Sequence, residues 1–226
     1  NYRTEIIQPQ TGNDSMKYGY NGISQFSSVR NTDASSTLDK LGFKSEGTNL
    51  NLRYQNNSIL MDSLFGVRYN LSKQPVQKFG FKEIATKSGV SLSENEYALP
   101  IAFLSAKTYK NASFTNLTLD NQTRFIHQIT DEKYKFYKKL NILSPTSQNS
   151  TSSLQTAKIE EDSHLSYASI QYEVTVPAHS QLYVNVPNLH FSNDDRKDIE
   201  IDYNGQTQRY TIDNAFPFFS IGYFDT

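Results

Sequence analysis

The chain has 226 residues, with 22 Lys and Arg against 23 Asp and Glu, and therefore a formal charge of -1 at pH 7. This length allows one large domain or two small ones with a real hydrophobic core. A near-neutral charge excludes the basic field that draws proteins to nucleic acid, so no nucleic-acid partner is expected. The absence of Cys excludes disulfides and thiolate metal sites; it suits the surface of a Gram-positive cell, but many cytosolic proteins also lack Cys, so it does not fix the compartment.

Two short helices are expected early in the chain. Asn31 and Ser58 are suited to cap helices over residues 34–41 and 59–65, and a glycine follows each segment. Apolar and polar residues then alternate over residues 67–71, which predicts a half-buried strand directly after the second helix. The first half therefore has an α/β character.

Two further strands and two further helices follow in the prediction. The strands are expected at residues 79–85 and 97–108, and the second is too apolar to be exposed on both faces. Helical spacing covers residues 121–129 and 130–140. The basic side chains around the last helix fit either a membrane surface or an ordinary solvated face; they are Lys133, Lys135, Lys138 and Lys139.

A polar, low-complexity run from residue 144 marks the expected internal boundary, because the hydrophobic period changes to two beyond it. The expected strands after it are 170–176, 182–186, 199–203, 208–212 and 216–224, with a tight turn at Asn204 and Gly205. The predicted fold class is α+β, with an α/β N-terminal half and an antiparallel β-sandwich C-terminal half. The predicted domains are 1–143 and 155–226, joined by a linker at 144–154.

Signals for catalysis are weak. The four histidines are scattered without a zinc-binding spacing, at His127, His164, His179 and His190. No nucleophile elbow, Walker loop or dinucleotide-binding glycine motif occurs. The acidic runs fit a calcium site or, more simply, a solvated strand edge; they are 160–162, 194–195 and the face of Asp198, Glu200 and Asp202. We therefore expect no catalytic residue, no metal ligand and no cofactor.

A polar and aromatic run near the N-terminus is the best candidate for ligand contact. Amide and Arg side chains can hydrogen-bond sugar hydroxyls or phosphate, while a Tyr ring covers a sugar face. The same residues could instead hold a loop through their own hydrogen bonds. The candidates are Tyr20, Asn21, Gln25, Ser27, Ser28 and Arg30.

Several segments in a fixed order resemble one family. These are residues 18–31, 41–43, 61–69 and 97–103, joined by the element Asn95-Glu-Tyr-Ala-Leu-Pro100 and the pair Asn121-Gln122. Together they resemble the YfhO family of bacterial polytopic membrane proteins, which is associated with C-type glycosyltransferases that decorate cell-wall polymers. The resemblance is densest over residues 18–107.

The resemblance implies a location and a role. No stretch of about 20 apolar residues occurs, so the chain is expected to be an extracellular part of a longer membrane protein. The parent would transfer a sugar from a lipid-phosphate donor to teichoic acid or a similar polymer. This part would be non-catalytic and would position the acceptor, with the parent's transmembrane portion and the glycopolymer as its partners. The alternative is an autonomous carbohydrate-binding or adhesive module of the cell surface.

Overall fold

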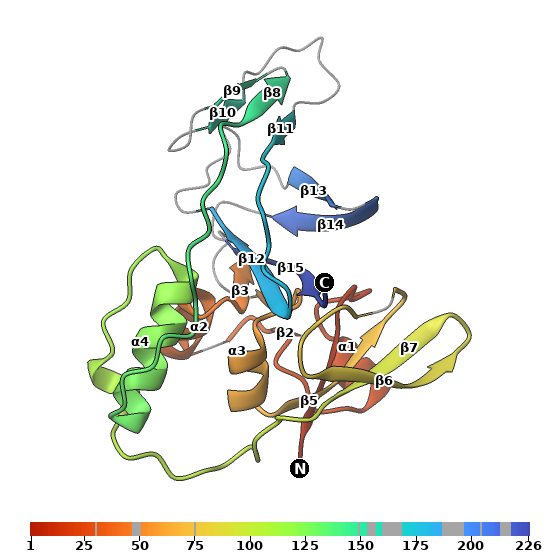
Figure 1. Cartoon of the computed structure of the whole chain (residues 1–226). Helices are drawn as coiled ribbons and strands as arrows, with labels where there is room; N and C mark the ends of the chain where they lie inside the picture. Colours follow the sequence, from red (N-terminus) through yellow and green to blue (C-terminus); the bar gives the residue numbers. More distant parts are fainter. Residues whose placement is uncertain are drawn as a thin grey trace. The chain divides into compact units, whose positions relative to one another are not determined.

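The computed structural model describes residues 1–29, 31–46, 51–74, 76–148, 150–152, 157–159, 169–186, 197–203, 205–212 and 218–226. Contacts between residues divide the chain into two compact units (Figure 1). Unit 1 contains Asn1–Lys135 and Gln181–Tyr223, and unit 2 contains Phe136–Ser180 and Phe224–Thr226. The sequence predicts two domains joined by a linker at 144–154. A division by contacts does not test whether the parts fold independently, so this boundary stays a prediction.

The described helices are α1 (Asp14–Tyr18), α2 (Thr32–Lys40), α3 (Ile59–Leu64), the 3-10 turn η1 (Tyr109–Asn111) and α4 (Thr118–Thr130). Two helices, α2 and α3, begin directly after the caps predicted at Asn31 and Ser58, whereas α1 was not predicted and α4 begins at Thr118 without a side-chain cap. The Asn31 side chain accepts a hydrogen bond from the Ala34 amide at 3.0 Å, and the Ser58 hydroxyl accepts one from the Met61 amide at 3.3 Å. None of the helices in the described ranges has the length and apolar character that crossing a membrane requires.

The largest sheet lies in unit 1 and has the strand order β1-β5-β7-β6. Its strands are β1 (Arg3–Ile6), β5 (Val67–Ser72), β6 (Phe81–Lys87) and β7 (Val90–Asn95). β1 pairs in parallel with β5, and the other pairs are antiparallel. β5 is therefore an inner strand of this sheet. The alternating pattern predicted that Asn70 faces solvent, but its side chain is fully buried.

A second sheet of unit 1 has the order β2-β4-β3. Its strands are β2 (Gln25–Phe26), β3 (Lys44–Glu46) and β4 (Asn51–Arg53). The first hydrophobic cluster lies among these elements and contains Leu41, Phe43, Tyr54, Met61 and Val67 together with Phe125 and Ile129 of α4. α4 is thereby fixed to the N-terminal elements.

The C-terminal strands build a second cluster in unit 1. β12 (Ser180–Asn185) pairs with β15 (Phe218–Phe224), and β13 (Lys197–Tyr203) pairs with β14 (Gln206–Ile212). Phe218, Phe219 and Ile221 are buried here and contact residues of both β12 and β13, so two small sheets pack together. The α+β class is confirmed, and the packed strand pairs are compatible with the expected sandwich. The β13–β14 hairpin was predicted, with its turn at Asn204 and Gly205. Gly205 has a φ of +75°, and Asn204 lies outside the described residues.

Unit 2 contains two small antiparallel pairs. β8 (Thr146–Gln148) pairs with β11 (Ser169–Gln171), and β9 (Ser150–Ser152) pairs with β10 (Ala157–Ile159). The amide of Leu143 donates to the Glu173 carbonyl at 3.1 Å, which extends the first pair beyond its ladder. Parts of the polar run expected as a linker thus form strands, while residues 149, 153 and 154 lie outside the described residues.

Three predicted elements are wrong. Residues 97–108 form no strand, and the strand of this region is β7 instead. Residues 130–140 form no helix, because α4 ends at Asp131, whose backbone turns to a left-handed conformation with φ +61°. Only residues 170 and 171 of the expected strand at 170–176 pair in a ladder, as part of β11.

Candidate functional site

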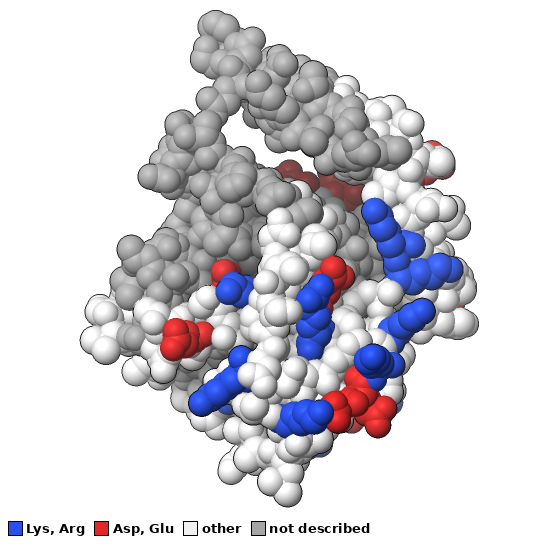
Figure 2. Space-filling view, turned by 90° about the vertical axis from the view of Figure 1, so that its left-hand side faces the viewer, with Lys and Arg blue, Asp and Glu red and all other residues white. Residues whose placement is uncertain are grey.

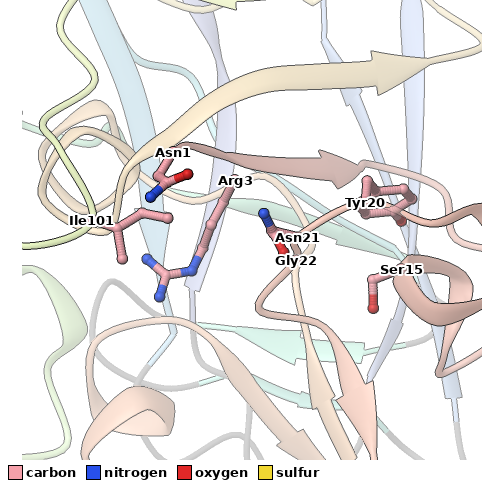
Figure 3. Close-up of a pocket in the computed structure, with 7 residues that line it drawn as sticks. All are labelled: Asn1, Arg3, Ser15, Tyr20, Asn21, Gly22 and Ile101. Atoms are coloured by element: carbon pink, nitrogen blue, oxygen red, sulfur yellow. The ribbon is translucent and has the colours of Figure 1, made fainter.

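A polar pocket with a volume of about 510 Å³ opens between β1, the turn after α1, and the segment that follows β7. Its lining residues, labelled in Figure 3, are Asn1, Arg3, Ser15, Tyr20, Asn21, Gly22 and Ile101. All seven belong to unit 1. In the view of Figure 3 the Arg3 guanidinium lies between the side chains of Ile101 and Asn21.

Arg3 is held in place by the parallel pairing of β1 with β5. Its amide donates to the Gly66 carbonyl at 2.7 Å, and its Nη1 donates to the Phe65 carbonyl at 2.5 Å. A guanidinium has five N–H donors, so the bond to Phe65 leaves it able to bind an anion in the pocket. Arg3 is therefore the cationic group of the site.

Tyr20 and Asn21 reach the pocket through the end of α1. Gly19 ends this helix in the left-handed conformation, and the Tyr20 amide donates to the Ser15 carbonyl at 3.0 Å. The Thr4 amide of β1 then donates to the Asn21 carbonyl at 2.8 Å. These backbone bonds fix the turn against β1. In Figure 3 Asn21 lies next to Arg3, and Tyr20 lies on the other side of Asn21.

Gly22 lines the pocket and also lies against the buried carboxyl group of Glu5. A Cβ at Gly22 would lie 3.1 Å from Ser15 Cβ and 3.3 Å from both Glu5 Oε1 and Tyr20 Cε2, so a side chain there would displace its neighbours. Glu5 itself is fully buried. Replacing Gly22 would therefore disturb the pocket and the Glu5 side chain together.

Glu5 accepts hydrogen bonds from the turn that builds the pocket. Its carboxyl accepts from the amides of Ile23 and Ser24 and, at 2.8 Å, from the Ser24 hydroxyl. Burial raises the pKa of Glu5 to about 7, although these bonds oppose the shift. Burial is also the main cause of the raised pKa of Tyr20, and the Glu5 charge adds to it. The pocket wall therefore carries a group that titrates near neutral pH.

The run predicted for ligand contact is only partly gathered in this pocket. Tyr20 and Asn21 line it. Gln25 is exposed on β2, Ser28 is exposed beyond it, and the Ser27 hydroxyl donates to the Val29 carbonyl at 2.6 Å. Arg30 lies outside the described residues. Ligand binding by any of the six stays a prediction.

Sequence reasoning missed the other five lining residues, which are Asn1, Arg3, Ser15, Gly22 and Ile101. Arg3, Ser15 and Ile101 reach the pocket through strand pairing and through backbone bonds far apart in the sequence, and neither leaves a local pattern. The sequence does show a charged residue, Arg3, in a segment with the alternating pattern of a strand. This pattern does not identify a binding residue, because many exposed strand residues are charged.

Two elements that carry the family resemblance are structural. Asn95 donates to the Val67 carbonyl at 3.0 Å and accepts from the Tyr97 amide at 2.9 Å. Both members of the Asn121-Gln122 pair are buried, and their side-chain amides donate at 3.0 Å to the carbonyls of Lys40 and Leu41. They therefore join α4 to the end of α2.

The pocket lining combines a cationic side chain, an amide and an aromatic ring. A guanidinium, an amide and a phenol can together bind hydroxyl and phosphate groups. Within the described ranges, no group of three His, Asp or Glu side chains is placed to hold a metal ion.

Comparison with known proteins gave one family match. The family model described as bacterial membrane protein YfhO matches residues 1–226. Neither the curated proteins nor the solved structures gave a match.

Proposed function

The chain belongs to the YfhO family of bacterial membrane proteins, and from this premise we propose that it is the extracellular part of a membrane glycosyltransferase that modifies cell-wall polymers. The acceptor is teichoic acid or a similar phosphate-containing glycopolymer. The described residues hold one strand of this polymer in the Arg3 pocket, and the sugar-transferring residues belong to other parts of the parent protein.

The observation that carries the proposal is the composition of the pocket lining. Arg3 is suited to a phosphate group of the polymer, because a guanidinium bonds phosphate oxygens through two N–H groups at once. The Asn21 amide is suited to a hydroxyl of the repeating unit, and the Tyr20 ring to its apolar face. Such a site binds and orients the acceptor without catalysing its reaction.

The test is binding of an oligomer of glycerol phosphate by the 226-residue chain, measured by titration calorimetry. A hydrogen bond to a charged group contributes about 1.5–3 kcal/mol, so Arg3→Gln should weaken binding roughly 10-fold to 150-fold. Asn21→Ala should weaken it by a smaller factor. Lys87→Gln is the matched control, because it removes one positive charge from the exposed end of β6.

Four outcomes separate the possibilities. Selective weakening by the pocket variants supports the acceptor site. Equal weakening by Lys87→Gln would show that binding depends only on the overall charge, and it would contradict the site. The absence of binding by the wild-type chain would contradict the site as well. Binding of an uncharged oligosaccharide in place of the phosphate oligomer would favour the autonomous carbohydrate-binding module.

A second measurement concerns Arg30, which lies outside the described residues. If the run from Tyr20 contributes to the acceptor site, Arg30→Ala in the parent protein should lower polymer glycosylation while the melting temperature stays unchanged. The isolated chain should transfer no sugar from a polyprenyl-phosphate donor.

A further inference from the structure

Residues 97–104 form an exposed apolar loop. Its large side chains are Tyr97, Leu99, Ile101, Phe103 and Leu104, and all five are exposed, Leu104 completely, at 101%. From Tyr97 to Ala106 the sequence contains no charged residue. Soluble surfaces rarely gather this much apolar side chain in one short segment, and such patches mark interaction sites.

The loop is anchored at both ends rather than loosely attached. At its start the Leu99 amide donates to the Ser63 carbonyl at 2.9 Å, and the Leu99 carbonyl lies where a Cβ on Gly66 would be only 3.0 Å away. Just beyond its end the Ala106 amide donates to the Ile129 carbonyl at 3.0 Å. The backbone is therefore held against α3 and α4. The Tyr97 ring stacks on Phe79 with the ring centroids 5.7 Å apart, and Ile101 faces the pocket, while Phe103 and Leu104 stay exposed.

The loop lies at one end of unit 1, close to the start of the chain. In Figure 1 the N-terminus and the segment leading from β7 to α4 occupy the same lower end of this unit. Ile101 also lines the pocket with Asn1 and Arg3. Lys and Arg are interspersed with Asp and Glu over the face in Figure 2, but the lowest surface in that view is uncharged.

We propose that residues 97–104 insert into the interfacial region of a lipid bilayer. Aromatic and aliphatic side chains are suited to the boundary between headgroups and acyl chains. An irregular loop needs water for its free backbone groups, and the interface supplies it, whereas the hydrocarbon centre does not. Lys110 follows the apolar segment and can lie among anionic headgroups, while Lys107 forms an ion pair with Asp131 at 2.7 Å.

Two features favour lipid over a protein partner. The complete exposure of Leu104 shows that the loop protrudes there, and residues 97–104 form no strand whose edge could pair with a partner. The chain also belongs to a membrane protein family. The inference goes beyond acceptor binding and does not depend on it. It also replaces the expected basic helix at 130–140, which does not form, as the candidate for membrane contact.

The first test uses the absence of Cys from the chain, which allows one labelled position at a time. Leu104→Cys carrying an environment-sensitive fluorophore should show a blue-shifted emission with phosphatidylcholine vesicles that contain phosphatidylglycerol. Val29→Cys is the matched control, because Val29 is also apolar and is 85% exposed outside the loop. Equal shifts at both positions, or no shift at position 104, would overturn the proposal.

The second test measures how much unlabelled 226-residue chain floats with the same vesicles. Phe103→Ser with Leu104→Ser should lower the partition coefficient about tenfold or more, because two apolar side chains no longer leave water. Met16→Ser with Val29→Ser, which removes two exposed apolar side chains elsewhere, should change it less than about twofold. Circular dichroism melts should match for both double variants, since none of the four side chains is buried.

The outcomes also separate the loop from the acceptor site. Arg3→Gln should leave vesicle binding unchanged, so a failure of the acceptor proposal leaves this result intact. Wild-type chain that stays unbound would overturn the lipid assignment. A dimer detected by sedimentation and lost in the loop variant would also overturn it, in favour of a second copy.

Discussion

Lys78 and Asp62 form an ion pair whose side chains are both completely buried. The Tyr54 hydroxyl donates to Asp62 Oδ2 at 2.9 Å, and Lys78 Nζ donates to Asn56 Oδ1 at 3.0 Å. Burial raises the pKa of Asp62 and lowers the pKa of Lys78, while the charge of each partner opposes the shift of the other. Each charge is thus kept in the core of unit 1 by its partner.

Removing one member of this pair should destabilise the chain strongly. Lys78→Met leaves the Asp62 carboxylate buried without its partner, which typically costs about 3–5 kcal/mol of unfolding free energy. Lys78→Met combined with Asp62→Leu should cost much less than the sum of the single changes, because neither charge of this pair is then left buried without its partner. Urea unfolding of the four proteins measures this coupling, and additive effects would contradict the pairing. Lys82→Met, at an exposed position of β6, is the control and should change stability by less than about 0.5 kcal/mol.

Stability should fall as the pH rises from about 4.5 to about 7, through Glu5. Its carboxyl loses its proton near the ordinary pKa of 4.5 in the unfolded chain, but only near 7 in the folded chain. Between these values the folded chain binds more protons, so the free energy of unfolding decreases with pH and is constant on either side. The difference corresponds to about 3 kcal/mol.

Glu5→Gln tests this dependence, because it keeps an acceptor for the Ile23 amide and removes the titrating group. Urea unfolding at several pH values should give a flatter profile for this variant and a higher stability at pH 8. Glu132→Gln, which removes an exposed carboxyl group, should keep the wild-type slope. An unchanged slope in Glu5→Gln would assign the pH dependence to other groups.

Gln122→Ala should destabilise the junction between α4 and the end of α2. Its amide donates to the Leu41 carbonyl and to Asn57 Oδ1, and its oxygen accepts from the Ser58 hydroxyl at 2.7 Å. Each buried group left without a partner costs about 1–3 kcal/mol. Thermal melts should show a lower Tm for this variant, whereas Asn111→Ala at an exposed position should match wild type. A small effect at Gln122 would mean that water replaces the lost bonds.

Limited proteolysis tests the expected boundary at residues 144–154. A polar run between compact parts should be cut first, and the two fragments should stay folded if they are independent domains. Mass spectrometry identifies the cut. Complete protection of residues 147–153 with preferred cutting elsewhere would contradict the linker.

The sequence predicted the elements whose causes are local. α2 and α3 follow from the caps at Asn31 and Ser58 and from the glycines after them, and the β13–β14 hairpin follows from two alternating strands. The segment 97–104 was misjudged because its apolar pattern does not reveal what covers it. An apolar run of this kind predicts a strand buried in the core. The same composition also suits a segment that is covered by something other than the core, such as a lipid bilayer, and the sequence alone does not distinguish the two.

The pocket could be predicted only in its contiguous part. Tyr20 and Asn21 are neighbours in one turn, so their shared surface follows from the sequence. Arg3 and Ile101 join them because β1 pairs in parallel with β5 and because the loop is bonded to α3. Both arrangements depend on tertiary contacts, and those contacts are not encoded in any local spacing.

The last strand of unit 1 returns to its earlier elements. The Tyr223 amide donates to the Gln77 carbonyl at 3.0 Å, and Leu119 of α4 packs against the cluster around Phe218. During synthesis, the residues that cover Leu119 leave the ribosome long after α4 does. Leu119 therefore stays without this cover until residues 218–221 have been made, and a chain truncated before residue 218 leaves that face of α4 exposed to solvent.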